Sequence, residues 1–114
     1  MPTLAVDTLT HFCEDILKGA GVPRHKAEIA AACLVASNLR GVDSHGIQLL
    51  PFYIDQILAS EMDPFADGRV LSEGGSCLHF DGQNGLGQWV AETCCGHAIR
   101  IARRRVTARV ATHR

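Results

Sequence analysis

Apolar residues recur at helical spacing along the first half of the chain. An apolar stripe with positions at i, i+3, i+4, i+7 and i+8 predicts a first helix over residues 8–18, capped by Asp7 or Thr8. Pro23 opens a predicted second helix, residues 24–40, which Gly41 ends. The residues expected to face inward are Leu9, Phe12, Cys13, Ile16 and Leu17 in the first helix, and Ala27, Ala30, Ala31, Leu34, Val35 and Asn38 in the second.

A third helical pattern reaches about residue 59, and Asp43 or Ser44 is its expected cap. Pro51 lies too deep for the first turn of a helix that starts at Ser44. Two alternatives follow: a kink at Pro51, or a short turn before a helix that begins near Leu49. The positions expected to face inward are Ile47, Leu50, Ile54, Ile57 and Leu58.

The second half of the chain alternates between strand and helix patterns. Two short strands, residues 70–73 and 76–80, predict a hairpin joined at Gly74-Gly75. Residues 86–104 predict a fourth helix, and residues 106–112 are a strand candidate with no obvious neighbour to pair with. The inward positions of that helix are Val90, Cys94, Ala98 and Ile101.

This order of elements predicts an α+β fold. We expect an N-terminal helical bundle, residues 1–62, followed by the start of an α/β portion, residues 63–114, that contains the hairpin, the helix and the strand. Because the last strand lacks an obvious partner, we interpret the chain as the amino-terminal fragment of a longer protein.

Composition narrows the functional classes. With 46% hydrophobic residues and a net charge of −1, the 114-residue chain is too apolar for disorder. It shows neither a secretory signal nor an apolar run of about 20 residues, which predicts a cytoplasmic protein without membrane contact. Five unevenly spaced cysteines predict reduced thiols. The arginine run at residues 100–105 favours a solvated helix end over a phosphate or lipid contact, so no nucleic-acid partner is expected.

The Asp-Ser-His-Gly turn at residues 43–46 allows a structural and a functional interpretation. In the structural one, Asp43 and Ser44 cap a helix, Gly46 relieves crowding and His45 is incidental. In the functional one, His45 donates and accepts a proton, as an imidazole does at neutral pH. A third reading, in which His45 activates Ser44 as a nucleophile, is disfavoured because adjacent side chains rarely adopt the required geometry.

Other candidates are weaker on spacing alone. Gly82, Gly85 and Gly87 depart from the dinucleotide fingerprint, so a tight turn is favoured over a phosphate site at the helix start. Cys94, Cys95 and His97 lack a second Cys/His pair, and no metal is expected. Tyr53 lies eight residues after His45, about two helical turns on, and either shares its cleft or sits at a rim with its hydroxyl in water.

The string "SNLRGVDSHGIQLLPFYIDQI", residues 37–57, resembles the N-terminal signature of the malate/L-lactate dehydrogenase family with a non-Rossmann nicotinamide-binding fold. The two preceding helices, the turn "DGQNGLGQ" and the final helix and strand resemble the family in order and spacing, so the resemblance covers essentially the whole chain. It implies oxidation of 2-hydroxy acids or reduction of 2-keto acids with NAD or NADP, and a homodimer in full-length members. His45 matches the catalytic motif histidine, and Ser44 and Tyr53 match residues that contact cofactor or substrate.

The chain departs from the family in two ways. Leu49 stands where many members carry an arginine suited to grip a substrate carboxylate, so either the substrate differs or another residue binds it. Family chains are about three times as long, and a second histidine, a lysine and an aspartate of the site fall outside these residues. The alternative to an enzyme fragment is a catalytically inactive helical module that associates with a partner.

Overall fold

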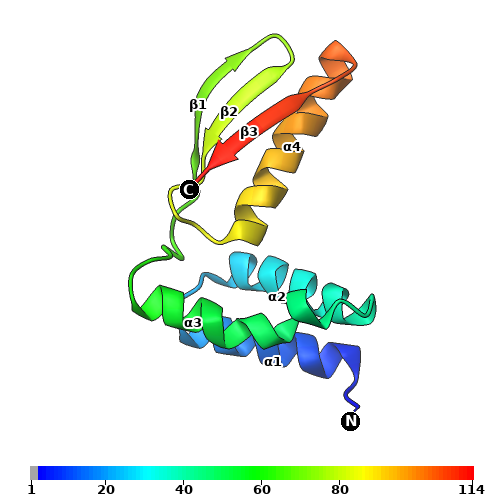
Figure 1. Ribbon diagram of the computed structural model, residues 1–114, viewed down its shortest axis with the longest axis vertical. Helices are drawn as coiled ribbons and strands as arrows, with labels where there is room; N and C mark the ends of the chain where they lie inside the picture. Colours follow the sequence, from blue (N-terminus) through cyan, green and yellow to red (C-terminus); the bar gives the residue numbers. More distant parts are fainter. Residues whose placement is uncertain (1–2) are drawn as a thin grey trace. The chain divides into compact units, whose positions relative to one another are not determined.

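The computed structural model describes residues 3–114 as two compact units, one that ends at Pro64 and one that spans Phe65–Arg114. The first is helical, and the second contains a three-stranded sheet with one helix. Figure 1 shows both. The α+β class predicted from the sequence is therefore confirmed, whereas the predicted boundary between residues 62 and 63 stays a prediction.

Two helices build the core of the first unit. Helices α1 (Val6–Gly19) and α2 (Arg24–Leu39) pack against each other. Small residues on α2 let the two helix backbones approach closely, as the alanine-rich stripe predicts. The buried apolar residues are Cys13 and Leu17 on α1, and Ala27, Ala30, Ala31, Leu34 and Val35 on α2.

A short irregular segment joins α2 to the third helix. Two turns of 3₁₀ helix, η1 (Asp43–His45) and η2 (Ile47–Leu49), precede α3 (Leu50–Leu58). Pro51 therefore lies in the first turn of α3, where its missing N–H leaves no helical bond unmade. Of the two alternatives from the sequence, the short turn before a helix near Leu49 is correct, and no kinked long helix forms.

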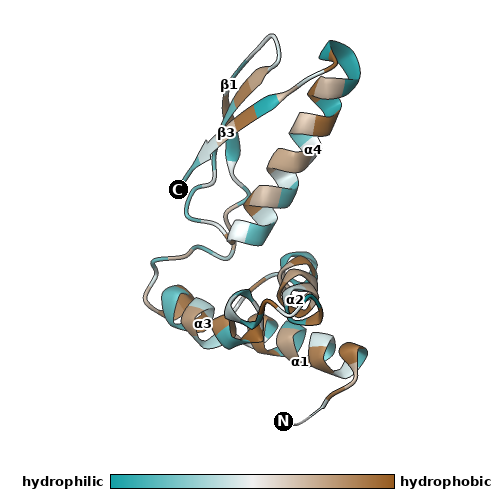
Figure 2. Cartoon of the chain, turned by 45° about the vertical axis from the view of Figure 1, so that its right-hand side comes forward, coloured by the Kyte–Doolittle hydropathy of each residue, from teal (hydrophilic) through white to brown (hydrophobic). Residues whose placement is uncertain are grey.

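The second unit is a sheet covered on one face by a helix. Strands β1 (Arg69–Gly74) and β2 (Cys77–Asp81) form the antiparallel hairpin, and β3 (Arg109–His113) pairs with β2 in parallel. Helix α4 (Gly87–Arg105) connects β2 to β3, alternates hydrophobic with hydrophilic residues, and ends in a hydrophilic turn (Figure 2). The buried cluster beneath it contains Leu78, Phe80, Val90, Cys94 and Ile101.

The pairing of β3 corrects the expectation that the last strand has no neighbour. A helix that crosses over a sheet returns the chain to the end where the previous strand began, so the next strand can pair with it in parallel. The helix over residues 87–105 is such a crossover between β2 and β3.

Some details of the helical patterns were also wrong. Helix α1 starts at Val6 without a side-chain cap, so neither Asp7 nor Thr8 caps it. Phe12 is 57% exposed and Leu58 is 72% exposed, although the apolar periodicity placed both on inward stripes. Periodicity predicts which face of a helix is apolar, but the number of residues buried on that face depends on the elements that pack against it.

The helical core gives a stability prediction from two leucines on α2. Leu34 is 1% exposed and Leu39 is 66% exposed. We expect Leu34→Ala to lower the free energy of unfolding by about 2–5 kcal/mol, because it removes buried methyl groups and leaves a cavity. Leu39→Ala, the matched control, should change it by less than about 0.5 kcal/mol. Urea unfolding followed by circular dichroism measures both, and equal effects would contradict the assigned helix face.

Candidate active-site turn

The Asp-Ser-His-Gly residues form a compact backbone turn directly after α2. The His45 N–H donates to the carbonyl of Val42 (3.1 Å), and the Gly46 N–H donates to the carbonyl of Asp43 (3.0 Å). Ser44 and His45 are exposed, whereas Gly46 is buried. The turn therefore exposes the side chains of Ser44 and His45 to solvent while its glycine packs inward.

Asn38, at the end of α2, holds this turn at two points. Its Nδ2 donates a hydrogen bond to Oδ1 of Asp43 (2.8 Å), and its Oδ1 accepts one from the backbone N–H of Ile47 (2.9 Å). The helical periodicity predicts that Asn38 faces inward, but it does not indicate these two partners. The expected capping by Asp43 or Ser44 was wrong, because α3 has no side-chain cap and the Asp43 carboxylate bonds to Asn38 instead.

Gly46 packs directly against the carboxamide of Asn38. Its backbone is extended, with φ −96° and ψ −151°, so backbone strain is not the reason for glycine here. A Cβ at this position would lie 2.3–2.5 Å from the Oδ1, Cγ and Nδ2 atoms of Asn38, inside van der Waals contact. Glycine is required because the Asn38 side chain is packed where a Cβ would lie. This agrees with the structural interpretation, in which Gly46 relieves crowding.

Ser44 and His45 form a side-chain pair. The Ser44 Oγ lies 2.9 Å from Nδ1 of His45, and the direction of the hydrogen bond depends on the imidazole tautomer. Adjacent side chains rarely reach this geometry, but the 3₁₀ turn brings the Ser44 hydroxyl and the His45 imidazole together here, while the disfavoured role of Ser44 as a nucleophile stays a prediction. Among the described residues, Ser44 is the group hydrogen-bonded to this ring.

Tyr53 lies half-buried on α3, with its ring centroid 6.2 Å from that of Phe52. Its predicted position, two helical turns after His45 on one face, assumed a continuous helix. The two 3₁₀ turns and the start of α3 at Leu50 break that periodicity, so the spacing argument does not apply. A shared cleft with His45 stays a prediction.

The glycine turn after β2 is built around the buried carboxylate of Asp81. Its Oδ1 accepts a hydrogen bond from the Gln83 N–H (2.8 Å), and its Oδ2 accepts one from Nη2 of Arg114 (2.5 Å). The bond from Gln83, followed by that from Arg114, holds the pKa of Asp81 below its ordinary value. A Cβ on Gly82 would lie 2.2 Å from the Arg114 carbonyl oxygen, so close packing accounts for this glycine.

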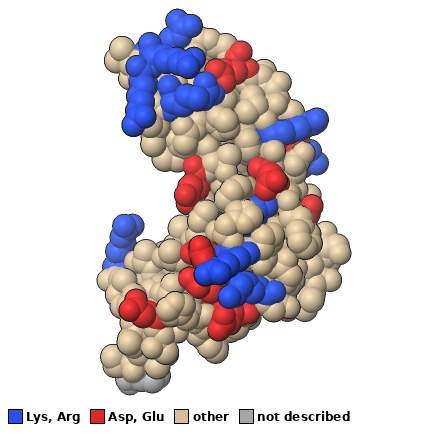
Figure 3. Space-filling model, turned by 180° about the vertical axis from the view of Figure 1, so that it is seen from behind, with Lys and Arg blue, Asp and Glu red and all other residues tan. Residues whose placement is uncertain are grey.

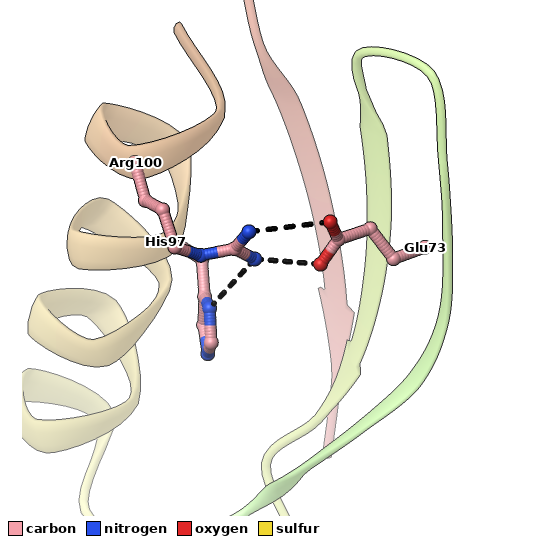
Figure 4. Close-up of polar contacts among 3 residues, drawn as sticks. All are labelled: Glu73, His97 and Arg100. Atoms are coloured by element: carbon pink, nitrogen blue, oxygen red, sulfur yellow. Dashed lines mark hydrogen bonds and ion pairs between the residues drawn. The ribbon is translucent and has the colours of Figure 1, made fainter. Parts of the chain in front are cut away.

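A second polar cluster lies in the sheet unit. Nη1 and Nη2 of Arg100 on α4 donate to the Glu73 carboxylate on β1 at 3.2 and 2.6 Å, and Nδ1 of His97 lies 3.5 Å from Nη2 (Figure 4). This bidentate bond is the main reason that the pKa of Glu73 is lowered. Lys and Arg side chains gather at one end of the unit (Figure 3), where the last turn of α4 carries Arg103, Arg104 and Arg105.

The described residues were also compared with the patterns of a metal site and of a membrane span. In residues 3–114, no group of three or more His, Cys, Asp or Glu side chains is arranged to hold a metal ion. Cys94 is buried and Cys95 is exposed, so the two adjacent thiols point to different faces of α4. Over the same range, none of the helices is long and apolar enough to cross a membrane.

Comparisons with known proteins give one consistent result. The sequence model of a family described as "Malate/L-lactate dehydrogenase" matches residues 4–114. A malate dehydrogenase of Pyrococcus horikoshii is 40% identical over 97 residues, which are 85% of this chain and 27% of that protein. An L-sulfolactate dehydrogenase of Methanocaldococcus jannaschii is 36% identical over 89 residues, which are 78% of this chain and 26% of that protein.

The fold is similar to solved structures over nearly its full length. The structure of the P. horikoshii malate dehydrogenase superposes with a TM-score of 0.94 at 36% identity, covering 97% of this chain and 32% of that one. A putative malate/lactate dehydrogenase from E. coli superposes with a TM-score of 0.95 at 27% identity, covering 99% and 32%. The chain thus spans about a quarter to a third of the length of the relatives it matches.

The contact between Gly46 and Asn38 predicts that a methyl group added at position 46 destabilises the fold. We expect Gly46→Ala to lower the free energy of unfolding by about 1–3 kcal/mol, because the new Cβ displaces a carboxamide held by two hydrogen bonds. Gly19→Ala, at the end of helix α1, is the control: apart from its chain neighbours and its own helix backbone, no atom lies within 4 Å of a Cβ there, and we expect no loss of stability. Urea unfolding of both variants measures the difference, and a neutral Gly46→Ala would contradict the close packing.

The lowered pKa of Asp81 predicts acid-sensitive stability in the sheet unit. Its folded-state pKa lies below the ordinary 3.8, so its stabilising contribution is present above that value and is lost as the pH falls through the folded-state pKa. We expect Asp81→Asn to be less stable at neutral pH and to lose less further stability on acidification. Asp55→Asn, at an exposed position on α3, should keep the wild-type pH dependence. Fluorescence of Trp89, the single tryptophan, follows unfolding of this unit, and an unchanged acid slope in Asp81→Asn would refute the assignment.

Proposed function

We propose, from the premise that this chain belongs to the malate/L-lactate dehydrogenase family, that it is the N-terminal portion of an NAD- or NADP-dependent oxidoreductase. Its substrates are 2-hydroxy acids, which it oxidises to 2-keto acids, or the reverse. The relatives named malate, L-sulfolactate and L-lactate dehydrogenase support this substrate class, since the acid named in each carries a hydroxyl next to a carboxylate. The homodimer and the cytoplasmic location stay predictions.

The observation that carries the proposal is the exposed Ser44–His45 pair. Oxidation of an alcohol removes a hydride from carbon and a proton from oxygen, and the proton needs a base within hydrogen-bond reach. In the tautomer in which Nδ1–H of His45 donates to the Ser44 Oγ, Nε2 carries no proton and is the ring nitrogen that serves the substrate oxygen. His45 then accepts the hydroxyl proton during oxidation and returns it to the carbonyl oxygen during reduction.

The donor set of this turn fits a nicotinamide cofactor and a hydroxy acid. A serine hydroxyl and an imidazole hydrogen bond to carboxamide, hydroxyl and carbonyl groups, which are the polar groups of those two molecules. The cofactor, when bound, supplies the hydride acceptor at its nicotinamide ring. We assign Ser44 to orienting His45 and contacting cofactor or substrate, and Tyr53 to a substrate contact from α3.

Leu49 limits how the substrate carboxylate is held. This residue is half-buried at the end of η2, at the position where an arginine was expected from the family resemblance. An apolar side chain offers a carboxylate neither charge nor a hydrogen bond. Either another residue binds that carboxylate or the substrate differs from malate, and a panel of hydroxy acids distinguishes the two.

A chimeric enzyme tests the proposal directly. Residues 4–114 replace the matching N-terminal segment of the P. horikoshii malate dehydrogenase, since 97% of this chain superposes on that structure. We expect the chimera to oxidise a 2-hydroxy acid with NAD or NADP, measured as absorbance of the reduced cofactor. His45→Ala should lower kcat/KM by about 10²–10⁴-fold, the usual contribution of a general acid–base group.

His11→Ala is the matched control, because His11 is an exposed histidine on α1 of the same helical unit. Its kcat/KM should equal that of the parent chimera. A folded chimera that turns over equally well without His45 would refute the assigned role. A folded chimera inactive on malate, lactate and sulfolactate would favour the alternative of an inactive association module.

A further inference from the structure

We infer that Asn38 is a positioning residue that holds the Ser44–His45 pair in its active arrangement. The catalytic meaning of this inference rests on the proposed function, whereas the structural claim does not. Asn38 lies near the C-terminal end of α2, six residues before Ser44 and seven before His45.

The two hydrogen bonds of Asn38 enclose the pair. One reaches Asp43, immediately before Ser44, and the other reaches the N–H of Ile47, two residues after His45. A single side chain therefore fixes both ends of residues 43–47. Because Ser44 and His45 are exposed, core packing does not hold them, and their position follows from the backbone that Asn38 fixes.

The chemistry of the contact demands an amide in one orientation. Asp43 offers a carboxylate oxygen, which only accepts a hydrogen bond, and Ile47 offers an N–H, which only donates one. The Nδ2 and Oδ1 atoms of Asn38 satisfy both at once. A rotated carboxamide would set donor against donor and acceptor against acceptor, so the two partners select a single orientation.

Gly46 completes the arrangement by leaving room for the carboxamide. The backbone of Gly46 passes so close to Asn38 that three atoms of the asparagine side chain occupy the space of a Cβ. The carboxamide thus lies between the backbone of Gly46 on one side and its two hydrogen-bond partners on the others. A residue whose only role was to end the helix would not need hydrogen bonds to both Asp43 and Ile47, nor a glycine backbone packed against its side chain.

An exchange of donor and acceptor tests the inference. In Asn38→Asp the acceptor for Ile47 remains, but a carboxylate now faces the Asp43 carboxylate and repels it. In Asp43→Asn the new side-chain oxygen still accepts from Asn38, so the contact survives. In the double variant Asn38→Asp/Asp43→Asn the bond is restored with its direction reversed, because the amide of residue 43 now donates to the carboxylate of residue 38.

The readout is the imidazole of His45 in the full 114-residue chain, labelled with ¹⁵N-histidine under mildly alkaline conditions. In the wild type, the Nδ1 resonance of His45 should differ from that of the exposed His11, because Ser44 is hydrogen-bonded to Nδ1. Asn38→Asp should move the His45 resonances to the values of His11. Asp43→Asn and the double variant should keep the wild-type values, while His11 is unchanged throughout.

This pattern separates positioning from general stabilisation. Wild-type His45 resonances in folded Asn38→Asp would overturn the inference. A double variant whose His45 resonances are shifted as far from the wild-type values as those of Asn38→Asp would overturn it as well. The double variant tests the inference even where Asn38→Asp alone fails to fold. Because no turnover is measured, these failures are distinct from failure of the proposed enzyme activity, which the chimera reports.

Discussion

The geometry of the turn at residues 43–47 depends on one carboxamide near the end of α2. Asn38 links a helix that is anchored by its buried stripe to a turn that has no core of its own. Rigid elements commonly position reactive groups on exposed loops in this way, because a loop cannot bury enough apolar surface to order itself. The arrangement places Ser44 and His45 in solvent without leaving their backbone unsupported.

In the sheet unit the corresponding constraint is the crossover made by α4. Its inward residues cover Leu78 and Phe80 of β2, and its length carries the chain back to pair β3 with β2. The turn that leads into α4 is fastened by Asp81, whose buried carboxylate bonds to the backbone N–H of Gln83 and to Arg114. Close packing accounts for Gly82 and Gly85, where a Cβ would meet the Arg114 and Ala66 carbonyl oxygens, but not for Gly87.

The family match, the superposition and the local chemistry of the turn each support a different part of the functional proposal. The match over residues 4–114 establishes a dehydrogenase family, and the superposition establishes that this chain folds as the corresponding third of its relatives. The specific role of each side chain is proposed from local chemistry, in which a hydroxyl bonded to an exposed imidazole suits proton transfer. At position 49 this chain has a leucine, whereas the family resemblance leads one to expect an arginine that binds the substrate carboxylate.

The sequence by itself determined the elements and the motif. Helical and strand periodicities reflect burial of one face, so they indicated four helices, the hairpin and the last strand, and the string around His45 indicated the family. Only the tertiary structure decided which apolar positions are covered, as exposed Phe12 shows, and that β3 pairs with β2. It also revealed Asn38, whose role depends on two partners, five and nine residues away, that a helical pattern does not bring together. Periodicity describes how one element meets its surroundings, whereas a hydrogen bond between elements depends on how they are packed.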